Sequence, residues 1–310
     1  MPNWNQVLTE IRKLATEHDA ASKAAVDLVR RKYLKQLHQA TGRNIIAYYS
    51  GFLSKPGILQ SGIEDEDKNG FMMAVHQLDR TKGLDLILHT PGGSIGATES
   101  LVDYLRQMFS DDIRAIVPQI AMSAGTMIAC SCKCIVLATH SNLGPIDPQM
   151  NGMPAAGVLE EFSRACREVK KDSSRTAIWQ AIIGQYSPTF LSQCENAISW
   201  SKDFVTTQLQ EVMFKGRVDG QKQARKVVRA LTDYRGNKAH NRHINRDECI
   251  AIGLNVETLE ADAKFQDLVL TVHHCYMHSL MNTASFKMIE NHLGAAFVKQ
   301  QQVVVQAVQS

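Results

Sequence analysis

The stretch LDLILHTPGGSIGATESLVDYLRQMF, residues 84–109, decides the fold. Its first seven residues form a short apolar run, which is typical of a strand buried on both faces of a parallel sheet. A glycine-rich turn and an amphipathic helix over 97–109 follow, and DIRAIVP (112–118) predicts the next strand. A helix beginning near Ser123 then leads to the strand CIVLA, 134–138. Strand, helix and strand at this spacing predict right-handed crossover units in an α/β domain.

Outside this region the chain adds further helices. Residues 3–40 have the apolar periodicity of a helix, which must pack on the body or on a partner subunit. A strand is expected over 44–52 and a short helix over 71–81. The second half is mainly helical and ends in a strand-like tail, VVVQAV. Its expected helices span 157–171, 175–186, 189–213, 219–231 and 262–293, with a short helix that closes on Gly253 before the last of them. We therefore predict an N-terminal helical extension (1–42), an α/β domain (43–260) and a C-terminal helical extension (261–310).

The composition excludes several classes of protein. Of the 310 residues 44% are hydrophobic, and 34 basic against 31 acidic residues leave a net charge of +3. A charge this near zero argues against a protein built to bind nucleic acid. The charged N-terminus lacks the apolar core of a signal peptide. Seven cysteines without a disulfide-scaffold spacing indicate reduced thiols and a cytoplasmic protein.

One uncharged stretch has the length of a membrane span. It is AIVPQIAMSAGTMIACSC, the 18 residues between Arg114 and Lys133. Proline, serine and glycine interrupt it, which a smooth apolar helix would not tolerate. We predict a buried strand, a sharp turn and a buried helix instead, and no transmembrane segment.

Two groups of side chains raise the question of a metal. Cys130, Cys132 and Cys134 alternate, so on a strand they would share one face, and His274 and His278 lie four residues apart on the C-terminal helix. Neither group is followed by further ligands at zinc-like spacing, and packing or subunit contact accounts better for the histidines. No dinucleotide-binding glycine motif follows a strand. We predict neither a metal nor a cofactor.

Two turns carry the candidate chemistry. In His89–Ser94, adjacent Gly92 and Gly93 between a strand and a helix would let a substrate approach backbone N–H groups, which could stabilise an oxyanion. A tight turn without a ligand is the alternative. In Ala121–Thr126, Ser123 lies between a strand and a helix among small residues, as a nucleophile does. A serine that only caps the helix is the alternative there.

Four motifs in this order resemble the serine dehydrogenase proteinase family, within the superfamily of Clp-type peptidases, signal peptide peptidase A and crotonases. PGGSIGATESL lies about 30 residues before AMSAGTMIA, and LGPIDPQ and the pattern HxxxIxxxxxxxIGL follow. The resemblance covers roughly residues 40–260. It implies a Clp/crotonase-like spiral of βαβ units with added N- and C-terminal helices, a peptide or protein substrate, and a homo-oligomer (trimer, hexamer or ring).

The resemblance also assigns site residues motif by motif. They are the nucleophile Ser123, the acid Asp147, the base His240, and the oxyanion-hole residues Gly92, Gly93 and Ala124. The order Ser…Asp…His differs from the Ser…His…Asp order of Clp-type peptidases. The residue chemistry agrees, since a serine needs a base within reach and the base needs an orienting carboxylate. We expect a serine peptidase or amide hydrolase.

Several alternatives stay open. His243 competes with His240 as the base, although only His240 has the motif spacing to Ile244. Lys170 or Lys171 could form a Ser–Lys dyad with the nucleophile, as in signal peptide peptidase A, but both lie in a charged run typical of a solvated face. The chain could also be a degenerate oligomeric scaffold or binding protein of the same fold, or act on a thioester.

Overall fold

A seven-stranded sheet forms the centre of the computed structural model, which describes residues 4–17 and 22–301. The strands in spatial order are β10 (Val256–Thr258), β5 (Cys134–Leu137), β3 (Ile113–Val117), β2 (Leu84–His89), β1 (Asn44–Ser50), β11 (Ser285–Asn291) and β12 (Ala296–Gln300). The first five run parallel, and β11 and β12 are antiparallel to their neighbours. The predicted α/β class with a mostly parallel sheet is confirmed.

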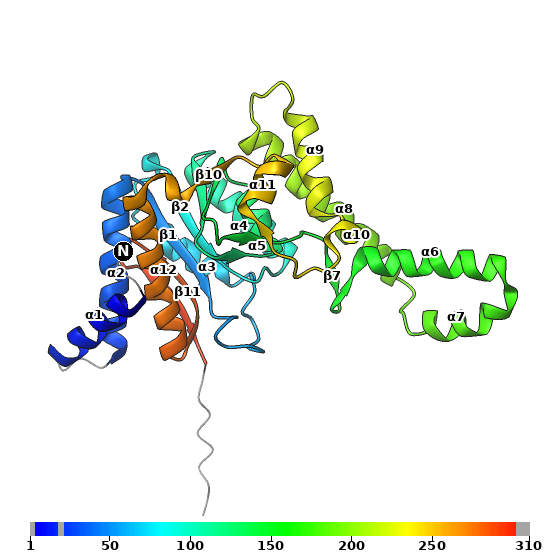
Figure 1. Ribbon diagram of the computed structural model, residues 1–310, viewed down its shortest axis with the longest axis horizontal. Coiled ribbons are helices and arrows are strands. Elements are labelled where there is room, and N and C mark those ends of the chain that lie inside the picture. Colours follow the sequence, from blue (N-terminus) through cyan, green and yellow to red (C-terminus); the bar gives the residue numbers. More distant parts are fainter. Residues whose placement is uncertain (1–3, 18–21, 302–310) are drawn as a thin grey trace, which may run out of the picture.

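Helices cover both faces of this sheet (Figure 1). Alternate residues of each strand point to opposite faces, so Ile46 and Tyr48 join one core and Ile45 and Tyr49 join the other. The first core packs against α3 (Asp67–Val75), α4 (Ile95–Phe109) and α5 (Ala124–Cys130). The second packs against α1 (Trp4–Glu17), α2 (Ser22–Thr41) and α12 (Ala263–Asn282). The helix expected over 71–81 is α3, which begins and ends several residues earlier than predicted.

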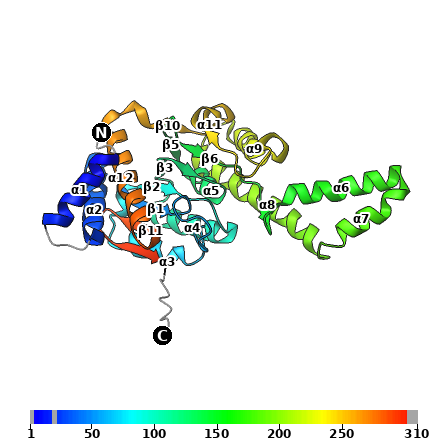
Figure 2. The same cartoon turned by 60° about the horizontal axis from the view of Figure 1, so that its bottom comes forward.

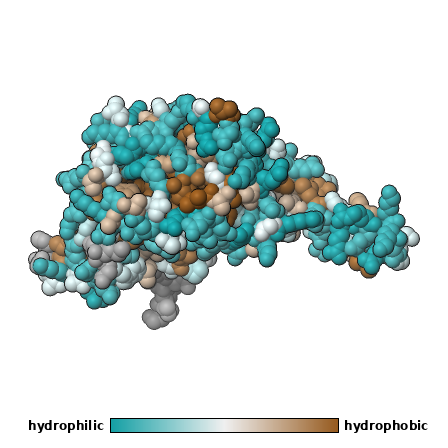
Figure 3. Space-filling model, turned by 45° about the horizontal axis from the view of Figure 1, so that its top comes forward, coloured by the Kyte–Doolittle hydropathy of each residue, from teal (hydrophilic) through white to brown (hydrophobic). Residues whose placement is uncertain are grey.

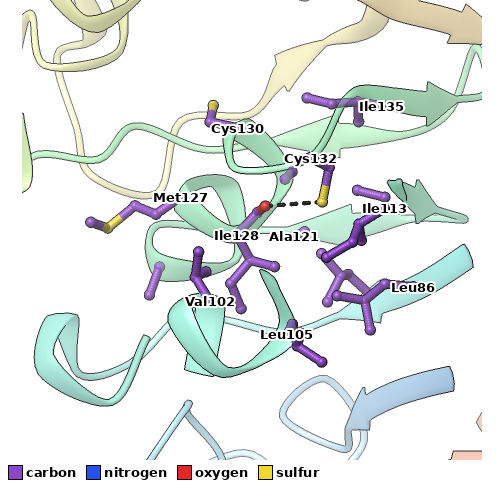
Figure 4. Packing of buried hydrophobic residues seen from close by; sticks show 14 of the residues in the cluster. Leu86, Val102, Leu105, Ile113, Ala121, Met127, Ile128, Cys130, Cys132 and Ile135 are labelled. Atoms are coloured by element: carbon purple, nitrogen blue, oxygen red, sulfur yellow. Dashed lines mark hydrogen bonds between the residues drawn. The ribbon is translucent and has the colours of Figure 1, made fainter. Parts of the chain in front are cut away.

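The uncharged stretch is divided as predicted. It supplies most of β3, the short strand β4 (Ile120–Ala121) and all of α5. Every residue of α5 is buried, and Figure 4 shows Ile128 packing beside Val102 and Leu105 of α4. Among the helices of the described ranges, none combines the length and the apolar character that a bilayer span requires.

The N-terminal segment forms two helices in place of the one expected. Residues 18–21, between α1 and α2, lie outside the described part. Val7 and Ile11 of α1, and Val29 and Leu37 of α2, are buried in the same core as α12. The sequence predicted that this apolar stripe packs either on the body or on a partner subunit. In the structure the body of the chain covers it.

The C-terminal prediction was wrong beyond residue 282. The helix α12 ends at Asn282, Thr283 is extended, and the residues expected to continue the helix form β11, antiparallel to β1. All seven residues of SFKMIEN are buried, because β11 lies between β1 and β12 inside the sheet and covers the edge of β1. The segment after residue 260 thus contains strands as well as a helix, and the three-domain division stays a prediction. The strand-like tail VVVQAV lies outside the described residues.

The helices of the second half are confirmed, with small differences at their ends. They are α6 (Ala155–Lys171), α7 (Thr176–Ile183), α8 (Phe190–Gln208), α9 (Gly220–Leu231) and α11 (Arg246–Ile252). The arm (residues 155–190), which contains α6 and α7, projects from the body in both Figures 1 and 2. A small cluster including Val158, Phe190 and Cys194 joins it to α8. In the view of Figure 3 hydrophilic side chains dominate the surface, and hydrophobic ones gather near the middle of the body and near the arm's base.

Candidate active site

A three-stranded sheet beside the main one brings together three distant segments of chain. Its strands are β4, β6 (Asn142–Leu143) and β9 (Ile244–Asn245), and Ala121, Leu143 and Ile244 are in register across it. Because β4 and β6 are parallel and β9 is antiparallel, the ends of the first two meet the start of the third at one edge. Ser123 and Asp147 follow that edge closely, and His240 precedes it.

Ser123 has the backbone of a strained turn. Its φ is +50° and its ψ is −114°, a backbone conformation that residues other than glycine rarely adopt. It occupies the N-cap position of α5, yet its hydroxyl makes no cap hydrogen bond. The alternative role of this serine as a helix cap is therefore absent from the structure. The strained strand-to-helix turn has the form of a nucleophile elbow.

Thr126 ties this turn to the loop that carries Asp147. Its hydroxyl donates to the Ala121 carbonyl at 2.9 Å and accepts from the Gly144 N–H at 3.0 Å. Further along the loop, the Ile146 N–H donates to the Leu231 carbonyl at the end of α9, at 3.0 Å. These contacts hold the loop in a single position.

The diglycine turn lies directly against Ser123. At Gly92, with φ +105°, an added Cβ would be 2.7 Å from the Ser123 Cβ, and at Gly93 it would overlap the backbone of Ile63, with the Ile63 Cα at 2.7 Å. Close approach of two backbones therefore requires glycine at both positions. The Gly92 N–H donates to the Thr90 hydroxyl at 3.2 Å.

Two other N–H groups are free to bind a ligand, one in the diglycine turn and one directly after Ser123. Within the described ranges, the N–H groups of Gly93 and Ala124 make no hydrogen bond. Gly92, the third residue expected in an oxyanion hole, shapes the turn while its own donor is occupied.

His240 and Asp147 form a direct hydrogen bond. The His240 Nδ1 lies 2.9 Å from the Asp147 Oδ1, and the side chains are 29% and 5% exposed. A carboxylate only accepts, so Nδ1 carries the proton and Nε2 remains as the basic nitrogen. The other carboxylate oxygen accepts from the Gln149 Nε2 at 2.9 Å. Both oxygens of Asp147 are thus engaged.

The loop of His240 is anchored by a buried amide. The Asn237 side chain donates to the Ala230 carbonyl at 3.1 Å and accepts from Arg242 at 3.0 Å. His243, the rival base, is exposed and does not line the cavity described next. Of the two histidines, the fold therefore places His240 and not His243 beside Asp147.

One cavity of about 680 Å³ has Ser123, His240 and Gly93 together in its lining. Its apolar wall includes Ile95, Met127, Ile146, Met150 and Trp200. The cavity thus combines a polar end with a hydrophobic wall.

The lysines of the alternative dyad lie elsewhere. Lys170 and Lys171 are exposed in the last turn of α6, and neither lines the cavity. The helix α6 extends away from the body toward that end (Figure 1). The structure does not bring these lysines to Ser123.

The candidate metal ligands are also separated. Cys130 ends α5, whereas Cys134 begins β5, so the alternating cysteines do not share one strand. The His278 Nε2 donates to the Trp4 carbonyl of α1 at 3.1 Å, which makes it a packing residue. In the ranges that the structure describes, no three His, Cys, Asp or Glu side chains gather as a metal site would require.

Sequence reasoning missed several residues of the site. Thr90 and Thr126 fix the turns, Gln149 holds Asp147, and Trp200 forms part of the cavity wall. Gln149 was within the GPIDPQ motif, so its position offered a signal. Trp200 comes from a helix distant in sequence, and nothing local marks it.

The chain is similar to known proteins over most of its length. The family model of the ClpP-like SDH-type serine proteinases matches residues 20–291. Uncharacterized protein MJ0137 of Methanocaldococcus jannaschii is 27% identical over 238 residues, 75% of either chain, and MJ1495 of the same organism is 26% identical over 74% of this chain and 72% of its own. An ATP-dependent Clp protease proteolytic subunit of Streptococcus sanguinis is 34% identical over 27% of this chain and 44% of its own. The chain belongs to the ClpP-like SDH-type serine proteinase family.

Proposed function

We propose that the protein is a serine peptidase or amide hydrolase that forms an acyl-enzyme on Ser123. The observation that carries this proposal is the 2.9 Å hydrogen bond between His240 and Asp147, made at the cavity that Ser123 also lines. A base held by a buried carboxylate beside a strained serine is the arrangement that nucleophilic acyl transfer needs.

The reaction proceeds in two halves. The Ser123 Oγ attacks the carbonyl carbon of the amide while His240 Nε2 takes the hydroxyl proton. The N–H groups of Gly93 and Ala124 stabilise the oxyanion. His240 then gives the proton to the departing nitrogen as the C–N bond breaks, leaving an ester on Ser123. In the second half water attacks this ester and gives a proton to His240. His240 passes that proton to the Ser123 Oγ as the ester C–O bond breaks, which releases the acid and the free serine.

A peptide or protein is the substrate that we propose. The apolar wall formed by residues such as Met127, Ile146 and Trp200 would hold a hydrophobic side chain next to the scissile carbonyl. Peptides with a leucine or phenylalanine before the cleaved bond should therefore react faster than those with aspartate or lysine.

A fluorophosphonate probe tests the nucleophile. Wild-type protein should gain the mass of one adduct on Ser123, identified by peptide mass spectrometry, and Ser123→Ala should gain none. A wild type that takes no label, or an alanine variant that takes as much, would refute the proposal.

Two alternatives have less support. Asp147 and His240 far from Ser123 would have favoured the scaffold hypothesis, whereas all three follow or precede strand ends at one sheet edge. A thioester hydrolase would use the same oxyanion donors, and failure of acyl-CoA to stabilise the fold would count against it.

The homo-oligomer and the cytoplasmic location stay predictions. Light scattering on the full chain would measure the assembly. A monomeric mass at micromolar concentration would remove the expectation of a trimer, hexamer or ring.

A further inference from the structure

A buried ion pair lies outside the site described so far. Lys287 of β11 has a side chain with 0% exposure, and its Nζ lies 2.9 and 3.0 Å from the two carboxylate oxygens of Asp67 in α3. The Tyr48 hydroxyl of β1 donates to Asp67 Oδ2 at 2.9 Å. Burial, together with the Asp67 charge, raises the pKa of Tyr48, so its hydroxyl stays a donor at neutral pH. None of the three residues lines the candidate active-site cavity.

Burying such charges is costly and adds little net stability. An apolar replacement of similar volume is often as stable as a buried ion pair. The informative feature is therefore where the remaining hydrogen bonds of the pair go.

Those hydrogen bonds converge on one short segment of chain, residues 61–64, which we call the bridging segment. The Lys287 Nζ donates to the Gly62 carbonyl at 2.5 Å, and Asp67 accepts from the Glu64 N–H at 3.0 Å. A neighbouring serine of β1, Ser50, donates to the Ser61 carbonyl at 2.7 Å. Side chains of β1, β11 and α3 thus hold the bridging segment at Ser61, Gly62 and Glu64.

The other side of the bridging segment holds the diglycine turn. The Ile63 N–H donates to the Gly92 carbonyl at 2.7 Å, and the Ser94 N–H donates to the Ile63 carbonyl at 2.9 Å. These two bonds flank Gly93 and pair the segments in parallel. They fix the orientation of the peptide unit whose free N–H belongs to Gly93.

We propose that Asp67 and Lys287 are positioning residues that hold the bridging segment and, through it, the Gly92–Gly93 turn in place against Ser123. The proposal rests on the proposed function for its catalytic consequence, because the Gly93 N–H is the oxyanion donor only if Ser123 acylates. Its structural half, the restraint of the turn, stands on the hydrogen bonds alone.

The expected effect is on the chemical step. Loss of one oxyanion-hole donor lowers kcat by about 10²–10³ in a serine hydrolase, and a displaced donor costs part of that. Lys287→Met should therefore lower kcat by about 10- to 100-fold and change KM by less than about 3-fold. Tyr48→Phe, which removes one hydrogen bond and keeps the ion pair, should have a smaller effect in the same direction.

The chain offers a matched control on the same strand. Glu290 of β11 points to the opposite face of the sheet, where Arg30 donates to it at 2.5 Å, and both side chains are as buried as the Lys287 pair. Arg30→Met removes a buried cation of similar length without a contact to the bridging segment. It should lower thermal stability and leave kcat unchanged.

Hydrogen exchange of the Ile63 and Ser94 amides is the readout that does not depend on activity. Lys287→Met should speed their exchange by at least about tenfold and Arg30→Met should not, since only the former loosens the bridging segment. If Lys287→Met fails to fold, Tyr48→Phe is measured in the same way.

The outcomes separate the two proposals. Unchanged exchange of both amides in Lys287→Met and Tyr48→Phe overturns this inference whether or not the protein is an enzyme. Faster exchange with an unchanged kcat in an active protein also overturns it, as does a change confined to KM. If the wild type takes no fluorophosphonate label, the proposed function fails. Even then, faster amide exchange in Lys287→Met without a change in Arg30→Met still supports the restraint of the turn.

Discussion

The hydrogen bonds on Asp147 make Asp147→Asn a demanding test of the triad. One carboxylate oxygen accepts from His240 and the other from Gln149, each at 2.9 Å. Asparagine keeps the shape but has one acceptor and one donor. If its oxygen faces Gln149, its NH₂ faces His240, whose proton must then move to Nε2. That tautomer cannot take the proton of Ser123.

The opposite orientation of the asparagine is also unfavourable. With the Gln149 amide oriented as it is here, the asparagine NH₂ would face the NH₂ of Gln149 where Asp147 is almost fully buried, and an unsatisfied buried donor costs about 1–3 kcal/mol. That cost alone corresponds to a loss of about 5- to 150-fold in rate. Losing the charge that stabilises the imidazolium brings the expected decrease in kcat to about 10²–10⁴.

The rate of Ser123 labelling by a fluorophosphonate, followed by intact mass under pseudo-first-order conditions, measures this effect. Circular dichroism and a thermal melt check that the variant is folded. The double variant Asp147→Asn/Gln149→Ala should recover part of the lost rate, because removing Gln149 lets the asparagine oxygen turn to His240. A labelling rate for Asp147→Asn within about threefold of wild type would refute the proposed role of the carboxylate.

Three further outcomes follow from the structure. Gly93→Ala should lower Ser123 labelling more than about 10²-fold, because the added Cβ overlaps the backbone of Ile63; near-normal labelling would mean that the turn is not part of the site. The variant Lys170→Ala/Lys171→Ala should label within about twofold of wild type, since both lysines are exposed at the end of α6, and a tenfold loss would restore the dyad hypothesis. Burial lowers the pKa of His89 to about 4 from 6.5, so the unfolded chain binds the proton first as pH falls. The free energy of unfolding, measured with urea, should decrease between about pH 6.5 and pH 4, by on the order of 3 kcal/mol from this group. His89→Gln should flatten that decrease, and identical pH dependence in the two proteins would contradict the assignment.

Local pattern was sufficient for much of the core. The apolar run at 84–90 and the interrupted stretch around Ser123 each indicated their own structure, because strand burial and turn chemistry depend on a few adjacent residues. The same approach failed at 285–291. SFKMIEN is a strand because the edge of β1 is open to it, and that edge comes from residues about 240 positions earlier.

The candidate site shows the same division. A resemblance between motifs pointed to Asp147 and His240, but spacing alone left His243 as a rival and Lys170 as another base. Pairing of β6 with β9 places only His240 beside the carboxylate, across 93 residues of sequence. No periodicity in the chain encodes that distance.

The sequence by itself determined the parallel strands, the sharp turn at Ser123 and the tight turn at the two adjacent glycines, because each depends on neighbouring residues and their backbone preferences. Only the tertiary structure decided which donor of the diglycine turn is free, which histidine meets Asp147, and that Lys287 lies behind the turn. Those results depend on the relative placement of β1, β9 and β11, which long-range packing sets.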